Sequence, residues 1–257
     1  MNKNITLIGE LVRREIRSRY LDSLSGFAWL IIQPLMLLLI YGFVFSVIFQ
    51  IRFPEAETTG FLPYLAVAFW PWTAFSEAVL KSVNSVTANA TLIDKVAISS
   101  EVFPIATVIS AFIMHSIGYL AILLVLTALG VPIHWLGLLP ALIVLIVLFI
   151  LALALGLVVS SLNVFVRDLE HMLPPVMMLW FFATPILYPA SMIPEKYAHW
   201  MEMNPMAGLM ESLRKYLLVG DFTDLGSLLL PIIITLVLLP LSIWFFRRLS
   251  PRFEDFF

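Results

Sequence analysis

The sequence predicts an all-α membrane protein with six transmembrane helices, an amphipathic helix at its N-terminus and an irregular segment before the last span. Hydrophobic residues make up 61% of its 257 residues and charged residues 12%, whereas soluble domains carry about 25% charged residues. Apolar runs long enough to cross a bilayer recur along the chain. The loops between them are too short for a second globular domain, so we expect a single transmembrane domain over residues 1–257.

Composition and motifs exclude several functions. The chain has no cysteine and a net charge of −2, which excludes disulfide and thiol chemistry and gives no indication of nucleic-acid binding. H-E-x-x-H, G-x-S-x-G and the phosphate-binding G-x-x-x-x-G-K-[ST] loop are all absent. We therefore expect no catalytic site, no metal site and no cofactor in this chain. The first apolar run is also too long for a cleavable signal peptide.

The N-terminal segment, residues 4–20, has the pattern of a helix lying in the membrane interface. Its apolar residues recur at helical spacing, and four arginines fall mainly on the other face. The apolar residues are Ile5, Ile8, Leu11, Val12 and Ile16, and the arginines are Arg13, Arg14, Arg17 and Arg19. This pattern suits a helix on anionic lipid. A helix that only anchors the chain and sets its orientation would show this pattern. A helix that transmits movement from a cytoplasmic partner would show it as well.

Five apolar runs predict spans, and a shorter run predicts a sixth. The five cover residues 30–49, 61–78, 104–129, 136–162 and 228–246. The shorter run, Val176–Tyr188, follows Pro174-Pro175 and extends about 20 Å as a helix, less than the roughly 30 Å hydrocarbon core. Extended to residue 193, it gives a fifth span over 176–193 that must pack against protein.

Orientation follows from the placement of lysine and arginine. Six spans put both termini on one side of the membrane. Only Arg52, Lys196, Arg214 and Lys215 fall on the other side, which leaves eleven of the fifteen basic residues with the termini. Positively charged loops favour the cytoplasm. Both termini and the loops 87–103 and 163–175 are therefore predicted to be cytoplasmic.

The second predicted span contains Pro71 and a dense aromatic group that includes Phe69, Trp72 and Phe75. Aromatic rings can form a belt at the headgroup level, or they can line a pathway for sugars. Glu77 and Lys81 lie one helical turn apart near the cytoplasmic end and suit an ion pair.

The cytoplasmic loop 87–103 predicts a short amphipathic helix that projects from the bilayer. Apolar Leu92 and Ile93 alternate there with polar residues, namely Asn89, Asp94, Lys95 and Glu101. Such a helix could dock into a partner, and a solvated connector is the alternative. In the third span His115 is the only ionisable residue, and we expect it to pack or form a hydrogen bond.

Several motifs, taken in order, resemble one family. They are Arg19-Tyr20, Gly26–Trp29, Gln33-Pro34, Phe69–Trp72, Asn89–Lys95, Asn163–Glu170, Thr184–Tyr188, Met192–Lys196 and Asn204–Arg214. In order and spacing they resemble the membrane subunit of ABC exporters for lipid-linked polysaccharides, with O-antigen export permeases nearest and capsule and teichoic-acid permeases as relatives. The resemblance covers nearly the whole chain.

The resemblance implies partners and a location. Two copies of this chain would form a channel for a lipid-linked polysaccharide in the bacterial cytoplasmic membrane, and two copies of a separate ABC ATPase would bind ATP and Mg²⁺. Membrane lipid would surround the dimer, and no nucleic acid would be involved. Residues 193–220 would form short re-entrant helices on the extracytoplasmic side.

The resemblance also implies three groups of functional residues. Aromatic residues would line the channel: Tyr41, Phe69, Trp72, Phe75, Trp180 and Phe181. Residues coupled to the ATPase would be Asn89, Leu92, Ile93, Asp94, Lys95, Glu101, Arg167 and Asp168. An extracytoplasmic gate would be formed by Pro185, Tyr188, Pro194, Asn204, Pro205 and Arg214. The chain departs from its relatives after Lys95, where a basic Phe-Pro stretch is replaced by Ala97–Glu101.

Two other hypotheses about the function stay open. An ABC permease for another substrate, such as capsule, teichoic acid or a small lipophilic molecule, would have the same architecture. A stand-alone channel or secondary transporter would work without an ATPase. The predicted spans other than the second lack Asp, Glu, Lys and Arg in their cores, so the ion-coupling groups usual in secondary transporters are missing.

Overall fold

Helix α4, Phe61–Ser82, forms the centre of a bundle in the computed structural model, which describes residues 2–20, 26–50, 60–95, 98–223 and 226–256. Most of its side chains are buried. Its 22 residues extend about 33 Å along the axis, enough to cross a hydrocarbon core. Within these ranges the chain is helical and contains no strand, which confirms the predicted all-α class.

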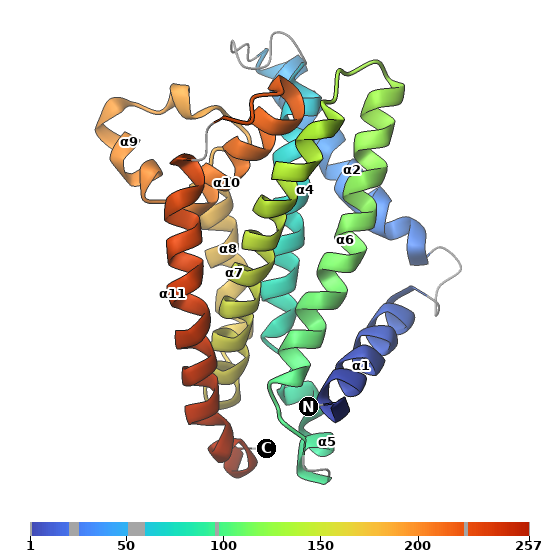
Figure 1. The fold of residues 1–257 in the computed structure, drawn as a ribbon, viewed down its shortest axis with the longest axis vertical. Coiled ribbons are helices and arrows are strands. Elements are labelled where there is room, and N and C mark those ends of the chain that lie inside the picture. Colours follow the sequence, from blue (N-terminus) through green and yellow to red (C-terminus); the bar gives the residue numbers. More distant parts are fainter. Residues whose placement is uncertain (1, 21–25, 51–59, 96–97, 224–225, 257) are drawn as a thin grey trace.

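Three long helices lie along the vertical axis of Figure 1: α6, Val102–Ala128, α7, Leu138–Phe165, and α11, Gly226–Leu249. Helices α6 and α7 pack against α4, and α11 packs against α7. By length and composition these are the helices able to cross a membrane among the described residues, with α7 extended back to Trp135 and α11 forward to Phe256 by 3₁₀ turns. They cover the predicted runs 104–129, 136–162 and 228–246. The chain is therefore a multi-pass membrane protein.

Two glycines allow the helices to approach α4 closely. A Cβ atom at Gly118 of α6 would lie 2.5 Å from the Trp70 ring, and one at Gly156 of α7 would lie 2.8 Å from the Ser82 hydroxyl. Small residues at helix crossings let backbones pack closely in membrane proteins. Trp70, which is fully buried, also donates its indole N–H to the carbonyl of His115 at 3.2 Å.

The predicted first span, 30–49, corresponds to α2, Gly26–Phe43, and a π-helical turn, Val44–Ile48. Pro34 lies inside α2, and many apolar side chains between Ile32 and Phe49 are exposed in the single chain. The predicted second span, 61–78, lies within α4. Apolar side chains on the outside of a bundle are expected for a helix that faces lipid or another subunit.

The predicted fifth span, 176–193, differs from the helix in the structure. Helix α8 begins at Leu169 and ends at Phe182, with Pro174 and Pro175 inside it. After α8 come a 3₁₀ turn, Ala190–Met192, then α9, Glu195–Glu202, then α10, Pro205–Arg214, and a π-helical turn, Lys215–Val219. Gly220 ends this segment with φ 76°, a left-handed conformation that favours glycine.

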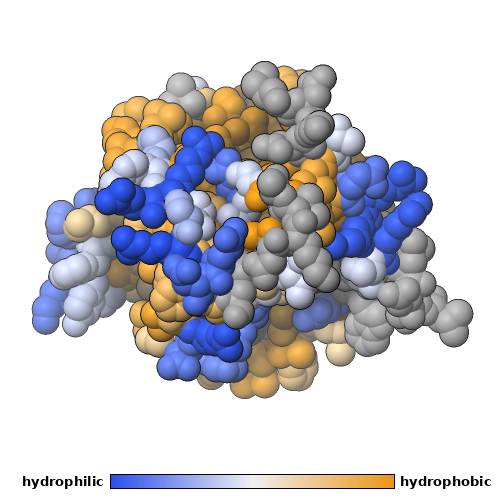
Figure 2. Space-filling model, turned by 90° about the horizontal axis from the view of Figure 1, so that it is seen from below, coloured by the Kyte–Doolittle hydropathy of each residue, from blue (hydrophilic) through white to orange (hydrophobic). Residues whose placement is uncertain are grey.

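Both termini lie at the end of the bundle opposite α9 and α10, together with helix α5, Ala90–Lys95, which follows a 3₁₀ turn, Thr87–Asn89 (Figure 1). The N-terminal helix α1, Asn2–Tyr20, leans against α6 here through Leu11 and Val12, which are buried with Phe103 and Ala106. Hydrophilic residues gather over this end, with hydrophobic residues around them (Figure 2).

Candidate functional site

All six residues predicted to line a channel meet in one aromatic cluster formed by α2, α4 and α8. Tyr41 lies 5.8 Å from Phe69 and 6.2 Å from Phe181 between ring centroids, and Phe181 lies 5.7 Å from Trp72. The cluster is completed by Trp180, whose ring stands edge-on to Trp72 at 5.9 Å and to Phe75 at 5.4 Å. These are favourable aromatic geometries.

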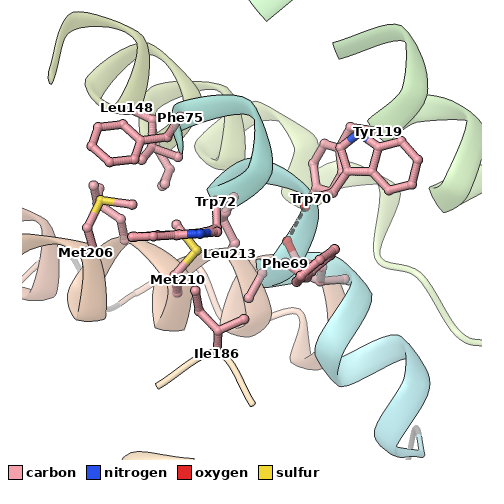
Figure 3. Close-up of a cluster of buried hydrophobic side chains, with 14 of the residues drawn as sticks. Phe69, Trp70, Trp72, Phe75, Tyr119, Leu148, Ile186, Met206, Met210 and Leu213 are labelled. Atoms are coloured by element: carbon pink, nitrogen blue, oxygen red, sulfur yellow. Dashed lines mark hydrogen bonds between the residues drawn. The ribbon is translucent and has the colours of Figure 1, made fainter. Parts of the chain in front are cut away.

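Most of these rings are buried in the single chain. Phe69, Trp72, Phe75 and Phe181 are at most 7% exposed, and only Tyr41 and Trp180 are half-buried. Figure 3 shows Trp72 and Phe75 directed toward neighbouring side chains of α7 and α10, among them Leu148, Met206 and Met210. Side chains of neighbouring helices therefore cover these four rings in this conformation.

Asn204 joins the start of α10 to the end of α8 through four hydrogen bonds. Its Oδ1 accepts from the Trp180 indole N–H at 3.0 Å and from the Met206 backbone N–H at 3.1 Å. Its Nδ2 donates to the Ala183 carbonyl and to the Thr184 hydroxyl, both at 3.1 Å. The amide thus caps α10 and fixes the orientation of Trp180.

Arg214, at the end of α10, is 3% exposed and holds the loop after α8 against α4. Its guanidinium donates to the carbonyls of Pro185 at 2.7 Å, Ile186 at 2.8 Å and Tyr64 at 3.2 Å. Its centre lies 3.7 Å from the centroid of the Tyr64 ring, and Glu211 approaches it at 3.7 Å. A buried guanidinium needs such partners, because an unpaired buried charge is costly.

The remaining predicted gate residues lie around the same loop. Pro185 is buried, and the half-buried Tyr188 donates its hydroxyl to the Phe182 carbonyl at 2.6 Å. Pro194 is exposed and precedes α9, and Pro205 is the first residue of α10, where a proline is well tolerated. The structure thus brings together Pro185, Tyr188, Asn204, Pro205 and Arg214, whereas Pro194 is the exposed residue before α9.

At the other end, Asn89 and Glu101 connect the loop around α5 to two other helices. Arg14 of α1 donates to Asn89 Oδ1 at 2.9 Å, and Asn89 Nδ2 donates to the Ser85 carbonyl at 2.8 Å. Glu101 accepts two hydrogen bonds from Arg247 at the end of α11, both at 3.0 Å. The loop is thereby tied to α1 and α11.

The other residues predicted to contact an ATPase are distributed around this end. Ile93 is buried and Leu92 is half-buried against it, so Ile93 packs inward rather than outward. Arg167 and Asp168 are exposed next to α8, and Arg167 lines a cavity of about 550 Å³ with Asn84 and Asn163. The side chains of Asp94 and Lys95 lie outside the part of the chain whose side chains are described.

The contact between Glu77 of α4 and His115 of α6 was not predicted from the sequence. Glu77 of α4 accepts from Lys81 Nζ at 3.0 Å through one carboxylate oxygen, and its other oxygen lies 2.9 Å from His115 Nε2 of α6. The i,i+4 pair was predicted, and the hydrogen-bonding role of His115 was expected, but not its partner. The available signal was that the second and third predicted spans each carry ionisable residues in an otherwise apolar setting.

No set of three or more His, Cys, Asp or Glu side chains able to hold a metal ion occurs among the described residues. The candidate functional site consists of an aromatic cluster, a hydrogen-bonded loop at one end of this cluster, and a charged face at the other end of the bundle.

Comparison with known proteins agrees with the resemblance drawn from the motifs. Residues 6–218 match the ABC-2 type transporter family. O-antigen export system permease proteins from Klebsiella pneumoniae and Myxococcus xanthus are 28% and 31% identical, over 97% and 91% of this chain and 94% and 88% of their own lengths. The polysialic acid transport protein of Escherichia coli is 25% identical over 92% of this chain and 91% of its own length. The chain belongs to the ABC-2 type transporter family of membrane permeases, whose members work with an ABC ATPase.

Proposed function

We propose that two copies of this chain form the channel of an ATP-driven exporter and that a lipid-linked polysaccharide of the O-antigen kind passes through it. The observation that carries the proposal is the similarity, over most of the chain, to permeases named for O-antigen and polysialic acid export. A bacterial cytoplasmic membrane location and cytoplasmic termini are part of the same proposal.

Six spans are proposed by adding α2, α4 and α8 to the three long apolar helices. The position of both termini at one end of the bundle supports an even number of spans. Helix α8 has 14 residues and extends about 21 Å, so it needs protein or a second subunit around its ends. We place α9 and α10 as re-entrant helices at the extracytoplasmic end.

The aromatic cluster is the proposed channel wall. Ring faces make weak contacts with the apolar faces of sugars, and such contacts tolerate a polymer that slides through changing registers. Because Phe69, Trp72, Phe75 and Phe181 are buried against one another, the described conformation corresponds to a closed wall. Opening would separate α8 from α4, and the loop held by Asn204 and Arg214 would act as the extracytoplasmic gate.

The cytoplasmic end is the proposed contact with the ATPase. Closure of two ATP-bound subunits would press on α5 and on the exposed Arg167 and Asp168. The hydrogen bonds from Asn89 to α1 and from Glu101 to α11 support transmission of that movement into the bundle, since they connect the loop to both helices.

The proposal is tested by deletion and complementation. In a strain that lacks this gene, we expect the polysaccharide to accumulate in the cytoplasm and to disappear from the cell surface. Expression of the chain should restore surface polymer. If surface polymer is unchanged by the deletion, polysaccharide export is not the function of this chain, and another ABC-2 substrate must be sought.

A second candidate is a transporter driven by protons without an ATPase. The observation that favours it is the Glu77–His115 contact, because ionisable pairs inside membrane bundles often carry protons. Vesicles that contain the purified chain alone would then move substrate when a pH gradient is imposed. Transport that requires the ATPase and persists without a gradient would exclude this candidate.

A further inference from the structure

A pocket of about 490 Å³ lies between the end of α8 and helix α9. This volume is within the range of small-molecule sites, about 300–1,000 Å³. Four aromatic side chains contribute to its lining, from α8, the following loop and α9: Trp180, Tyr188, Tyr197 and Trp200. Asn204 and Pro205 at the start of α10 complete one wall. The pocket thus adds α9 to the elements that present aromatic rings.

The α9 rings are available to a ligand, in contrast to those of the aromatic cluster. Trp200 is 72% exposed and Tyr197 is 52% exposed, whereas Trp72 is 5% exposed. Large rings that stand open around a common hollow mark a binding surface more specifically than single exposed residues do.

Trp180 connects the pocket to the aromatic cluster. Its ring forms part of the pocket lining and stands edge-on to Phe75 and Trp72. The hydrogen bond from its indole N–H to Asn204 fixes the ring before any ligand arrives. A side chain fixed in advance loses less conformational freedom on binding, which favours affinity.

We propose that this pocket is a saccharide-binding subsite in which sugar units of the polymer stack on Trp200 and Tyr197 as they pass the end of the channel. The inference rests on the proposed function and adds a binding site to it. Tryptophan and tyrosine combine an apolar face with a polar tip, which matches the apolar face and hydroxyl rim of a pyranose. The continuity with the channel wall through Trp180 favours a sugar over a lipid chain as the occupant.

Exposed tryptophans also occur in belts at the membrane interface. Trp244 on α11 is an example available for comparison, because it is 62% exposed and lies near the opposite end of the bundle. It is therefore a matched control for a tryptophan that contacts the membrane surface without binding sugar.

The test measures binding of polysaccharide to the purified full-length chain assembled with its ATPase subunit in nanodiscs. The probe is the polymer released from its lipid by mild acid, taken from the strain that carries the gene, and binding is followed by calorimetry. We expect Trp200→Ala to weaken binding about tenfold or more and Trp200→Phe to weaken it about threefold or less. Trp244→Ala should bind like the unmodified chain, and circular dichroism should show equal helix content in all variants.

Three outcomes would overturn the inference. They are no binding to the unmodified chain, equal binding by Trp200→Ala, and equal weakening by Trp244→Ala, which would indicate a general effect of the membrane surface. A fourth outcome would assign the pocket to acyl chains: brominated lipid quenches the tryptophan fluorescence of the unmodified chain more than that of Trp200→Phe. Surface polymer in the complemented deletion strain is measured in parallel, so that export without polymer binding rejects the subsite and leaves the proposed function standing.

Discussion

At the scale of single residues, Arg214 shows how a charge can be buried beside a membrane-embedded bundle. Its three carbonyl acceptors belong to α4 and to the loop after α8, and the Tyr64 ring covers its face. The planar guanidinium suits this arrangement, because it directs several N–H groups in fixed directions. The residue therefore joins three segments that are far apart in the sequence.

Replacing Arg214 with methionine should destabilise the chain strongly. The carbonyls of Tyr64, Pro185 and Ile186 would lose their donor in a buried place, and we expect the free energy of unfolding to fall by about 3 kcal/mol or more. Thermal unfolding in detergent, followed by circular dichroism, measures the effect. Arg248→Ala, at an exposed position on α11, is the control and should leave the melting temperature nearly unchanged. Equal melting of both variants would show that the Arg214 contacts do not stabilise the fold.

At the scale of elements, the packing of α4 against α6 combines close helix contact with a partly buried polar group. The lack of a side chain at Gly118 leaves room for the Trp70 ring between the helices. The Glu77 carboxylate contacts His115 of α6 and Lys81 of its own helix. Glu77 is central to this group, since both of its carboxylate oxygens are used.

Removing Glu77 should therefore cost more than removing His115. Glu77→Leu leaves both His115 and Lys81 without the carboxylate, while His115→Leu leaves the Glu77–Lys81 pair in place. We expect losses of about 2 and about 1 kcal/mol in the free energy of unfolding, and a double variant that is less destabilised than the sum. Chemical unfolding in mixed micelles gives the three values. A larger loss for His115→Leu than for Glu77→Leu would contradict this account.

The elements differ in how far they could be predicted from the sequence. Helices α4, α6, α7 and α11 follow from long apolar runs, because burial of backbone groups in a membrane requires helix. The start of α8 could not be placed, since Pro174-Pro175 indicates a break. In the structure both prolines lie inside the helix. Because proline has no N–H, the carbonyls four residues earlier, at Glu170 and His171, lose their helix donors. His171 is exposed, so its carbonyl can meet water.

The sequence predicted which residue types form the candidate site, but not which of them contact one another. The family resemblance pointed to all six rings of the cluster, and the re-entrant segment was expected near α9 and α10. The pairing of Arg214 with backbone carbonyls, of Asn204 with Trp180 and of Glu77 with His115 joins distant positions, and spacing along one chain carries no information about it. The inward packing of Ile93 likewise depends on Leu11, Val86 and Phe103, which meet only in the folded chain.

At the scale of the whole molecule, the two ends of the bundle have different characters. One end carries both termini, α1, α5 and a hydrophilic surface, and the other carries α9, α10 and the pocket beside Trp180 (Figures 1 and 2). Helix α4 runs between them and contributes to the aromatic cluster and to the polar group at Glu77. A movement at the end that carries the termini could thus be transmitted to the aromatic cluster through the single helix α4.

The central claim is that export by this chain is driven by an ATPase acting through α5. The direct measurement is ATP-dependent movement of lipid-linked polysaccharide into vesicles that contain the chain with its ATPase subunit. A second preparation has Ala90–Lys95 replaced by a Gly/Ser linker of equal length, and a third lacks the ATPase. The account predicts polymer export by the first preparation only, with ATPase binding weakened in the second. Unaltered export by the linker variant, or export without the ATPase, would contradict it.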